Sequence, residues 1–212
     1  MADTLTNTEY RAMIAEERAE FAAVLADLPA TQWDAPTLCD GWRVREVVAH
    51  MTMPFRMTAP RFALGMLRAR GNFNRMADHA ARQDTARLSA DDLAASMRDN
   101  VHHPWKAGPG GYEGALIHDI VHSLDITVPL GMDGRLPDDR LRVLTRLGSK
   151  RGVKFFGVDL TGVRLRADDL DWTFGSGEPL CGRAQDLALV VFGRKLPAGR
   201  LRGAASARFS TP

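Results

Sequence analysis

Apolar residues recur at intervals of three and four through the first two thirds of the chain, a pattern typical of helices that bury one face. Pro29, Pro54 and Pro60 interrupt this pattern, and a GPGG run at 108–111 precedes a further periodic stretch. The polar residues 72–87 predict a surface segment or a short helix. The longer helices predicted by the pattern cover residues 7–27, 43–54, 60–71, 89–103, 111–130 and 138–152.

The pattern changes after about residue 152. Val163 and Leu165 alternate with charged residues before a turn at 175–177, which predicts a short pair of strands. Residues 183–196 then predict a helix, and residues 200–210 predict a final strand. We therefore expect a mainly α protein with a helical bundle over 1–152 and a small C-terminal α/β domain over 153–212.

Composition and charge limit the classes of partner. The chain has 212 residues with 45% hydrophobic content, and its 28 basic and 26 acidic residues leave a net charge of +2. Such a small net charge does not favour nucleic acid or membrane partners, so small molecules are expected. The two cysteines, Cys39 and Cys181, form no CxxC pair, and no apolar run reaches the ~18 residues of a spanning helix. These features favour the reducing cytoplasm.

Two histidines share one face of the predicted helix at 111–130. At about 100° per residue, His118, His122 and Asp125 fall within about 60° of one another among aliphatic neighbours, so this face is expected to be buried. Buried imidazoles need polar partners, and a metal ion would satisfy both. Two hydrogen-bonded core histidines would give the same spacing.

His50, on another predicted helix, is the candidate third metal ligand. Glu46 lies one turn before it and is a candidate hydrogen-bond acceptor for its ring. Alternatively, Glu46 is a first-turn carboxylate favoured by the helix dipole.

Three stretches together resemble the mycothiol-dependent maleylpyruvate isomerase family of the DinB-like superfamily. They are TQWDAPTLCDGWRVREVVAH at 31–50, HDIVHSLDI at 118–126 and DWTFGSGEPLCGRAQDLALVVFGRK at 171–195. The first resembles the loop and helix that end in the family's first metal histidine, the second its paired-ligand helix, and the third its C-terminal signature. The resemblance implies a DinB-like four-helix bundle followed by a shortened α/β domain.

The resemblance implies divalent-metal ligands at His50, His118 and His122, with Asp125 matching the aspartate that follows the last ligand. It also implies that Arg194 contacts the substrate or the thiol, although Arg194 could instead cap the preceding helix. One position departs from the isomerase. The isomerase has a glutamate where this chain has His118, whereas other DinB-like proteins have a histidine there.

A site of three neutral imidazoles suits Zn²⁺ and leaves one coordination position open. We expect mycothiol to supply the nucleophile for isomerisation or S-transfer on a small electrophile, in a monomer or a homodimer. Two alternatives stay open: a non-catalytic metal-binding or stress protein, and a metal-dependent hydrolase. The hydrolase would need a general acid or base, for which Glu46, Glu113 and Asp119 are candidates.

Overall fold

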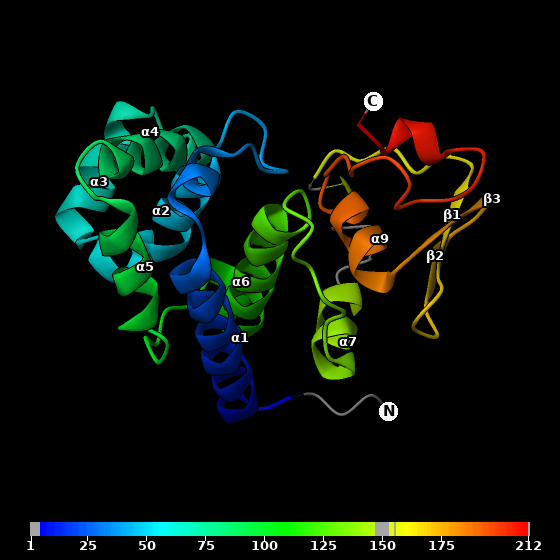
Figure 1. Cartoon of the computed structure of the whole chain (residues 1–212), viewed down its shortest axis with the longest axis horizontal. Helices are drawn as coiled ribbons and strands as arrows, with labels where there is room; N and C mark the ends of the chain where they lie inside the picture. The colour runs from blue at the N-terminus through cyan, green and yellow to red at the C-terminus, as the bar shows by residue number, and fades with distance from the viewer. Residues whose placement is uncertain (1–4, 147–152, 155, 212) are drawn as a thin grey trace. The chain divides into compact units, whose positions relative to one another are not determined.

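A computed structural model describes residues 5–146, 153–154 and 156–211 of the chain. The chain divides into two compact units, residues 1–126 and 127–212. The first unit is helical, and the second combines helices with a small sheet (Figure 1). This architecture confirms the expected mainly α fold with a C-terminal α/β part.

The helices of the first unit match most of the predicted segments. Those expected at 7–27, 43–54 and 111–130 are confirmed, and the polar segment at 72–87 forms a full helix. The helices are α1 (Asn7–Asp27), α2 (Val44–Arg56), α3 (Ala59–Arg68), α4 (Phe73–Thr85), α5 (Ala90–Arg98) and α6 (Gly111–Thr127).

Local sequence signals define the ends of α1. The hydroxyl of Thr6 accepts a hydrogen bond from the backbone N–H of Glu9, and the Glu9 carboxylate accepts one from the backbone N–H of Thr6. This reciprocal capping box satisfies N–H groups that have no partner within the helix. The helix ends at Asp27, just before Pro29.

The core of the first unit forms around α2, which packs against both α4 and α5, while α1 packs against α5. Val44, Val47 and Val48 of α2 are completely buried. Helix α6 is joined to α1 by a buried hydrogen bond in which the Ser123 hydroxyl donates to the Glu17 carboxylate at 2.7 Å. These contacts hold α2 and α6 within one packed unit.

The second unit contains α7 (Asp138–Arg146), β1 (Val163–Ala167), β2 (Thr173–Gly175), β3 (Glu178–Gly182) and α9 (Ala184–Val191). The strand order is β2-β1-β3, with β1 antiparallel to β2 and parallel to β3. Val163 and Leu165 are buried, as their alternation predicts, and α9 packs against β1 and β3. Helix α7 packs against α9.

Gly177 shows why the turn between β2 and β3 requires glycine. Its φ of +124° lies where L side chains are strained, and a Cβ there would lie 2.2 Å from the carbonyl oxygen of Gly162. The close backbone approach brings Glu178 into position to donate its N–H to that same carbonyl.

The structure differs from the sequence expectations in several places. The helix expected over 89–103 ends at Arg98, and the one expected over 183–196 ends at Val191. The division between units falls after Ile126, whereas 152 was expected, and α7 belongs to the second unit, where it packs on α9. The expected helix end at Gly152 lies outside the described residues. The prediction of a final strand over 200–210 is wrong: this segment makes isolated bridges at Arg202 and Ser210 and a 3-10 turn at Ser206–Arg208. Its glycine and alanine residues lack the side chains that stabilise a longer ladder.

Among the described residues, no helix combines the length and the apolar character needed to cross a bilayer.

Candidate metal centre

Helix α6 carries two of the three candidate ligands. The 3-10 turn Gly108–Gly110 precedes it, and Gly111, with a φ of +61°, leads into its first turn. Since His118 and His122 are four residues apart, both rings project from the same side of the helix. Their side chains are only 17% and 13% exposed, so this face of α6 is largely buried, as expected, and the two rings keep a small area of contact with solvent.

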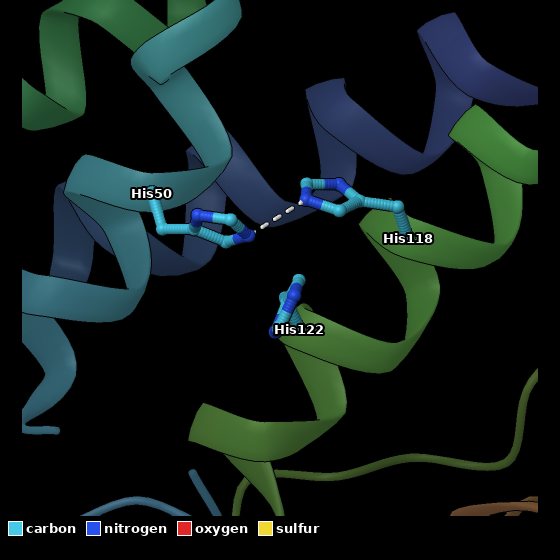
Figure 2. Close-up of side chains that lie close together, drawn as sticks. All are labelled: His50, His118 and His122. Atoms are coloured by element: carbon cyan, nitrogen blue, oxygen red, sulfur yellow. Dashed lines mark hydrogen bonds between the residues drawn. The ribbon is translucent and has the colours of Figure 1, made fainter. Parts of the chain in front are cut away.

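Helix α2 supplies the third ligand. Val47, Val48 and Met51 anchor this helix in the core, and His50 is 8% exposed. The three rings converge from α2 and α6, as Figure 2 shows. Ring centroids are 5.1 Å apart for His50 and His118, 5.0 Å for His50 and His122, and 4.7 Å for His118 and His122.

The ring nitrogens suit a shared cation. Nε2 of His118 lies 3.2 Å from Nε2 of His50, and each of the three histidines offers a nitrogen within 4.8 Å of the others. Nδ1 of His118 lies 3.0 Å from the Asp119 carboxylate, and Nδ1 of His122 lies 2.9 Å from that of Asp125. An ionised carboxylate only accepts hydrogen bonds, so each Nδ1 carries the proton and each Nε2 keeps its lone pair. The donor set therefore fits a divalent metal that prefers imidazole.

Asp119 connects His118 to helix α1. Its second oxygen accepts a hydrogen bond from Nε of Arg18 at 2.7 Å, and both side chains are at most 2% exposed. Arg18 also donates from Nη1 to the backbone carbonyl of His103 and lies over the Phe55 ring. From the sequence, Asp119 was predicted only as a candidate acid or base, and Arg18 was not predicted to support the site. The available signal was the position of Arg18 on the apolar stripe of α1, between Ile14 and Phe21.

Asp125 and Cys39 form the polar contact on the outer side of His122. The Cys39 thiol donates to Oδ2 of Asp125 at 3.0 Å, the same oxygen that meets Nδ1 of His122. Cys39 Sγ is also 3.8 Å from that nitrogen. The structure thus brings the carboxylate of Asp125 to the His122 ring, and brings Cys39 to the same carboxylate.

Two tryptophans contact the ligand rings. The Trp42 ring lies 5.2 Å from that of His50, and the Trp105 ring lies 4.9 Å from that of His118. Trp42 is held by a hydrogen bond from its indole N–H to Asp78 at 2.8 Å. Their aromatic surfaces therefore form part of the apolar surroundings of His50 and His118.

The structure does not bring Glu46 to His50. The Glu46 carboxylate accepts hydrogen bonds from the backbone and guanidinium of Arg43, and one from the Thr85 hydroxyl. Burial opposes ionisation of Glu46, but the hydrogen bonds and charge of Arg43 outweigh it and lower the pKa. Glu46 therefore takes the alternative role, at the first turn of α2. No described hydrogen bond or ion pair joins Glu113 to the three histidines.

In the second unit, Arg194 lines a cavity of about 350 Å³. Lys195, Arg208, Phe156 and Phe209 also line it, as does Asp159, which pairs with Arg208, so the lining carries a net positive charge beside apolar residues. Nη1 of Arg194 donates to the carbonyl of Phe192, the C-cap residue of α9, at 3.1 Å. The capping contact is therefore present, and the same side chain also faces a space that could hold an anion.

The chain resembles known proteins in three comparisons. Residues 14–107 match the family described as the mycothiol maleylpyruvate isomerase N-terminal domain, a match that includes His50 and Arg18 but not α6. Two uncharacterized proteins of Mycobacterium tuberculosis, MT0041 and Rv0036c, are each 27% identical over 220 residues, covering 86% of this chain and 85% of theirs.

Two solved structures share the fold. Crystal structures of the mycothiol-dependent maleylpyruvate isomerase, as a histidine-to-alanine mutant and without that substitution, cover 98% of this chain and 95% of theirs. Their TM-scores are 0.61 and 0.53, with sequence identities of 13% and 11%. The likeness therefore extends through both units as a similarity of fold.

Proposed function

We propose that the protein is a mycothiol-dependent isomerase or S-transferase with a divalent metal site, since residues 14–107 match the family described as the mycothiol maleylpyruvate isomerase N-terminal domain. The observation that carries this proposal is the convergence of His50, His118 and His122, with a carboxylate behind two of the rings. Zinc is the proposed metal, and the cytoplasm is the proposed location of a monomer or homodimer.

A divalent metal held by these three histidines would act as a Lewis acid that favours the ionised form of a thiol. Within the chain, Asp119 and Asp125 hold His118 and His122 in the tautomer that directs Nε2 into the site. The Cys39 thiol is hydrogen-bonded to Asp125 on the outer side of His122. The nucleophile is therefore proposed to be an external thiol instead of a side chain.

The proposed isomerisation uses reversible thiol addition. The sulfur adds to one carbon of a cis double bond conjugated to a carbonyl, the new single bond rotates, and elimination of the thiol leaves the trans product. For an alkyl electrophile, the sulfur attacks the carbon as the bond to the leaving group breaks, and for an epoxide it attacks a ring carbon as the C–O bond breaks; both give S-transfer. The residues of the chain need only orient the reactants and restrict water, a role proposed for Trp42 and Trp105 beside the ligand rings.

Arg194 is proposed to bind a carboxylate of the thiol or of the substrate. Its guanidinium lines the cavity of the second unit beside Lys195 and Arg208. A planar guanidinium can make two charge-assisted hydrogen bonds to one carboxylate, which favours this role over a purely structural one.

The alternatives have less support from the described residues. A hydrolase would need a general base, but Asp119 and Asp125 accept hydrogen bonds from ligand rings, and Glu46 is bound by Arg43. A purely structural metal would favour four protein ligands, whereas the described cluster around His50 contains three.

A mycothiol titration of Co²⁺-loaded protein tests the proposal directly. Binding of sulfur at the metal should shift the visible Co²⁺ absorption and add a thiolate charge-transfer band, while mycothiol with a methylated sulfur should leave the spectrum unchanged. Unchanged absorption with saturating mycothiol, in protein that has bound Co²⁺, would contradict the thiol-dependent function. Conversion of maleylpyruvate, followed with and without mycothiol, then separates isomerisation from S-transfer.

A further inference from the structure

Helix α3 presents apolar side chains to solvent. None of its residues is buried, and Leu64 and Leu67 are 46% and 76% exposed. Phe62 on the same helix and Phe73 at the start of α4 are 40% and 49% exposed. Single exposed apolar residues are common on proteins, but Leu64 and Leu67 are neighbours one turn apart on α3, and four large exposed apolar residues within twelve positions call for a partner.

The packing of α3 explains which side faces outward. Gly65 lies so close to α4 that an added Cβ would be 3.0 Å from Cγ of Met76. Ala69, also on this side, is completely buried in the cluster that includes Met76. At about 100° per residue, Leu64 and Leu67 point away from the Gly65 and Ala69 side. The inner face of α3 therefore packs against α4, and its outward face presents Leu64 and Leu67 to solvent.

The charge around this patch has one sign. The sequence between Glu46 and Asp78 contains no acidic residue and five arginines: Arg56, Arg61, Arg68, Arg70 and Arg75. Arg56 and Arg61 both bind the carboxylate of Asp84, which compensates part of their charge. The other three are exposed, and none of them has an ion pair among the described residues. Their charge is available to a partner outside this chain.

We propose that the outward face of α3, with Phe73 and the exposed Arg68, Arg70 and Arg75, binds the surface of an anionic lipid bilayer. The combination of an apolar face and flanking cations is that of a helix that lies in the interface, with apolar side chains among the acyl chains and arginines at the headgroups. This proposal does not depend on the metal site. It refines the expectation of no membrane partner, which rested on net charge averaged over the whole chain.

A second copy of the chain fits this surface less well. In a two-fold symmetric dimer through α3, the same patch would meet itself, and the three exposed arginines would face their own equivalents without a carboxylate between them. An acidic protein partner would satisfy the charge. However, an acidic protein would also need a shaped apolar groove to cover Leu64 and Leu67, whereas a fluid bilayer accommodates them without one.

Vesicle flotation of the full-length protein tests the proposal. The protein should float with vesicles of equimolar phosphatidylglycerol and phosphatidylcholine, not with phosphatidylcholine alone, and should be released as salt rises from about 0.05 M to about 0.5 M. Replacement of Arg68, Arg70 and Arg75 by Gln should weaken binding about a hundredfold, since each surface charge contributes roughly a fivefold factor. The Leu64→Ser, Leu67→Ser double variant should also lose binding.

The matched control replaces three exposed arginines elsewhere, Arg87, Arg142 and Arg146, by Gln. This control has the same net charge as the α3 charge variant and should retain most of the binding. Circular dichroism and metal content establish that each variant is folded. Absence of flotation with anionic vesicles at low salt, or equal losses in the control and in the α3 variant, would overturn the proposal.

Two further measurements assign the surface to another partner if the proposal fails. A wild-type dimer in light scattering that the Leu64→Ser, Leu67→Ser variant converts to monomer, without vesicle binding, would identify a contact between copies. Retention on immobilised polyglutamate without vesicle binding would identify an acidic protein as the partner. Either result would overturn the membrane assignment.

Discussion

Arg18 and Asp119 lie 101 residues apart in the chain, yet Nε of Arg18 donates to Oδ2 of Asp119 at 2.7 Å in the interior of the first unit. The other oxygen of Asp119 meets Nδ1 of His118. The arginine thus compensates the charge of a buried carboxylate that holds a candidate metal ligand. Packing of α1 on α6 and orientation of His118 are linked through this ion pair.

Replacement of Asp119 by Asn should affect both stability and metal binding. Loss of one partner from a buried ion pair leaves Arg18 uncompensated and should cost about 3–5 kcal/mol of unfolding free energy. Loss of the carboxylate behind His118 should weaken metal binding about 10- to 100-fold. Urea unfolding of metal-free protein and isothermal titration with Zn²⁺ measure the two effects. The exposed Asp91→Asn is the control.

An Arg18→Met, Asp119→Leu double variant separates the two effects. Replacing a buried ion pair by apolar residues of similar size is often neutral for stability, so the double variant should recover much of the lost unfolding free energy. Metal affinity should remain weak because His118 still lacks its carboxylate. Recovery of affinity together with stability would show that Asp119 acts only through the fold.

Asp125→Asn should likewise weaken metal binding about 10- to 100-fold because it removes the carboxylate that fixes the His122 ring. Cys39→Ser should have a much smaller effect, since a serine hydroxyl can also donate a hydrogen bond to Asp125. Zn²⁺ affinities of the two variants, compared with wild type, check this order. A larger effect from Cys39→Ser would point to a direct role for the thiol.

His103 should make the first unit less stable in mild acid. Burial and the nearby charge of Arg18 lower the pKa of His103 below its ordinary value. As pH falls through about 6.5, the unfolded chain binds the proton before the folded chain does, which favours unfolding. His103→Gln should therefore reduce the loss of unfolding free energy between about pH 7.5 and pH 5.5. The measurement uses urea unfolding with chelator present.

The exposed His79→Gln on α4 is the control for this pH dependence and should behave like wild type. An identical pH dependence in wild type and His103→Gln would remove His103 as a source of acid sensitivity. The other histidines are common to all three proteins, so their contribution cancels in the comparison.

Arg194→Lys should lower kcat/KM without releasing metal. Lysine keeps the positive charge in the cavity of the second unit but cannot form the paired hydrogen bonds of a guanidinium with a carboxylate. Loss of one charge-assisted hydrogen bond predicts a decrease of about tenfold or more. Steady-state kinetics with mycothiol and an electrophile, together with metal content, check this. Unchanged kinetics with a slightly lower melting temperature would leave Arg194 only its contact with Phe192.

The site histidines could be predicted because local spacing determines their geometry. His118 and His122 share a face of any α-helix, and α6 formed where the pattern placed it. His50 was suggested by its place at the end of a motif, since helical spacing within α2 cannot show which distant helix its ring will meet. The mainly α fold followed from the same periodicity and is confirmed.

The supporting residues depend on contacts between segments far apart in the chain. Arg18 lies on the apolar stripe of α1, but only its partner on α6 explains why a charge occupies the buried face. Glu46 shows the same limit, because its spacing from His50 left two roles open, and only the structure shows that its carboxylate binds Arg43. The division at Ile126 depends on the packing of α7 against α9, which the helical pattern of α7 does not encode.

Direct measurement of metal binding by wild type and His118→Ala tests the central claim that the three histidines form one metal site. Wild type should bind one equivalent of Zn²⁺ or Co²⁺. His118→Ala should lose about 10²-fold or more in affinity, and the control His79→Ala should bind like wild type. Metal should also raise the melting temperature of wild type and of His79→Ala, but not that of His118→Ala. Equal metal content and equal metal-dependent stabilisation in wild type and His118→Ala would contradict the account.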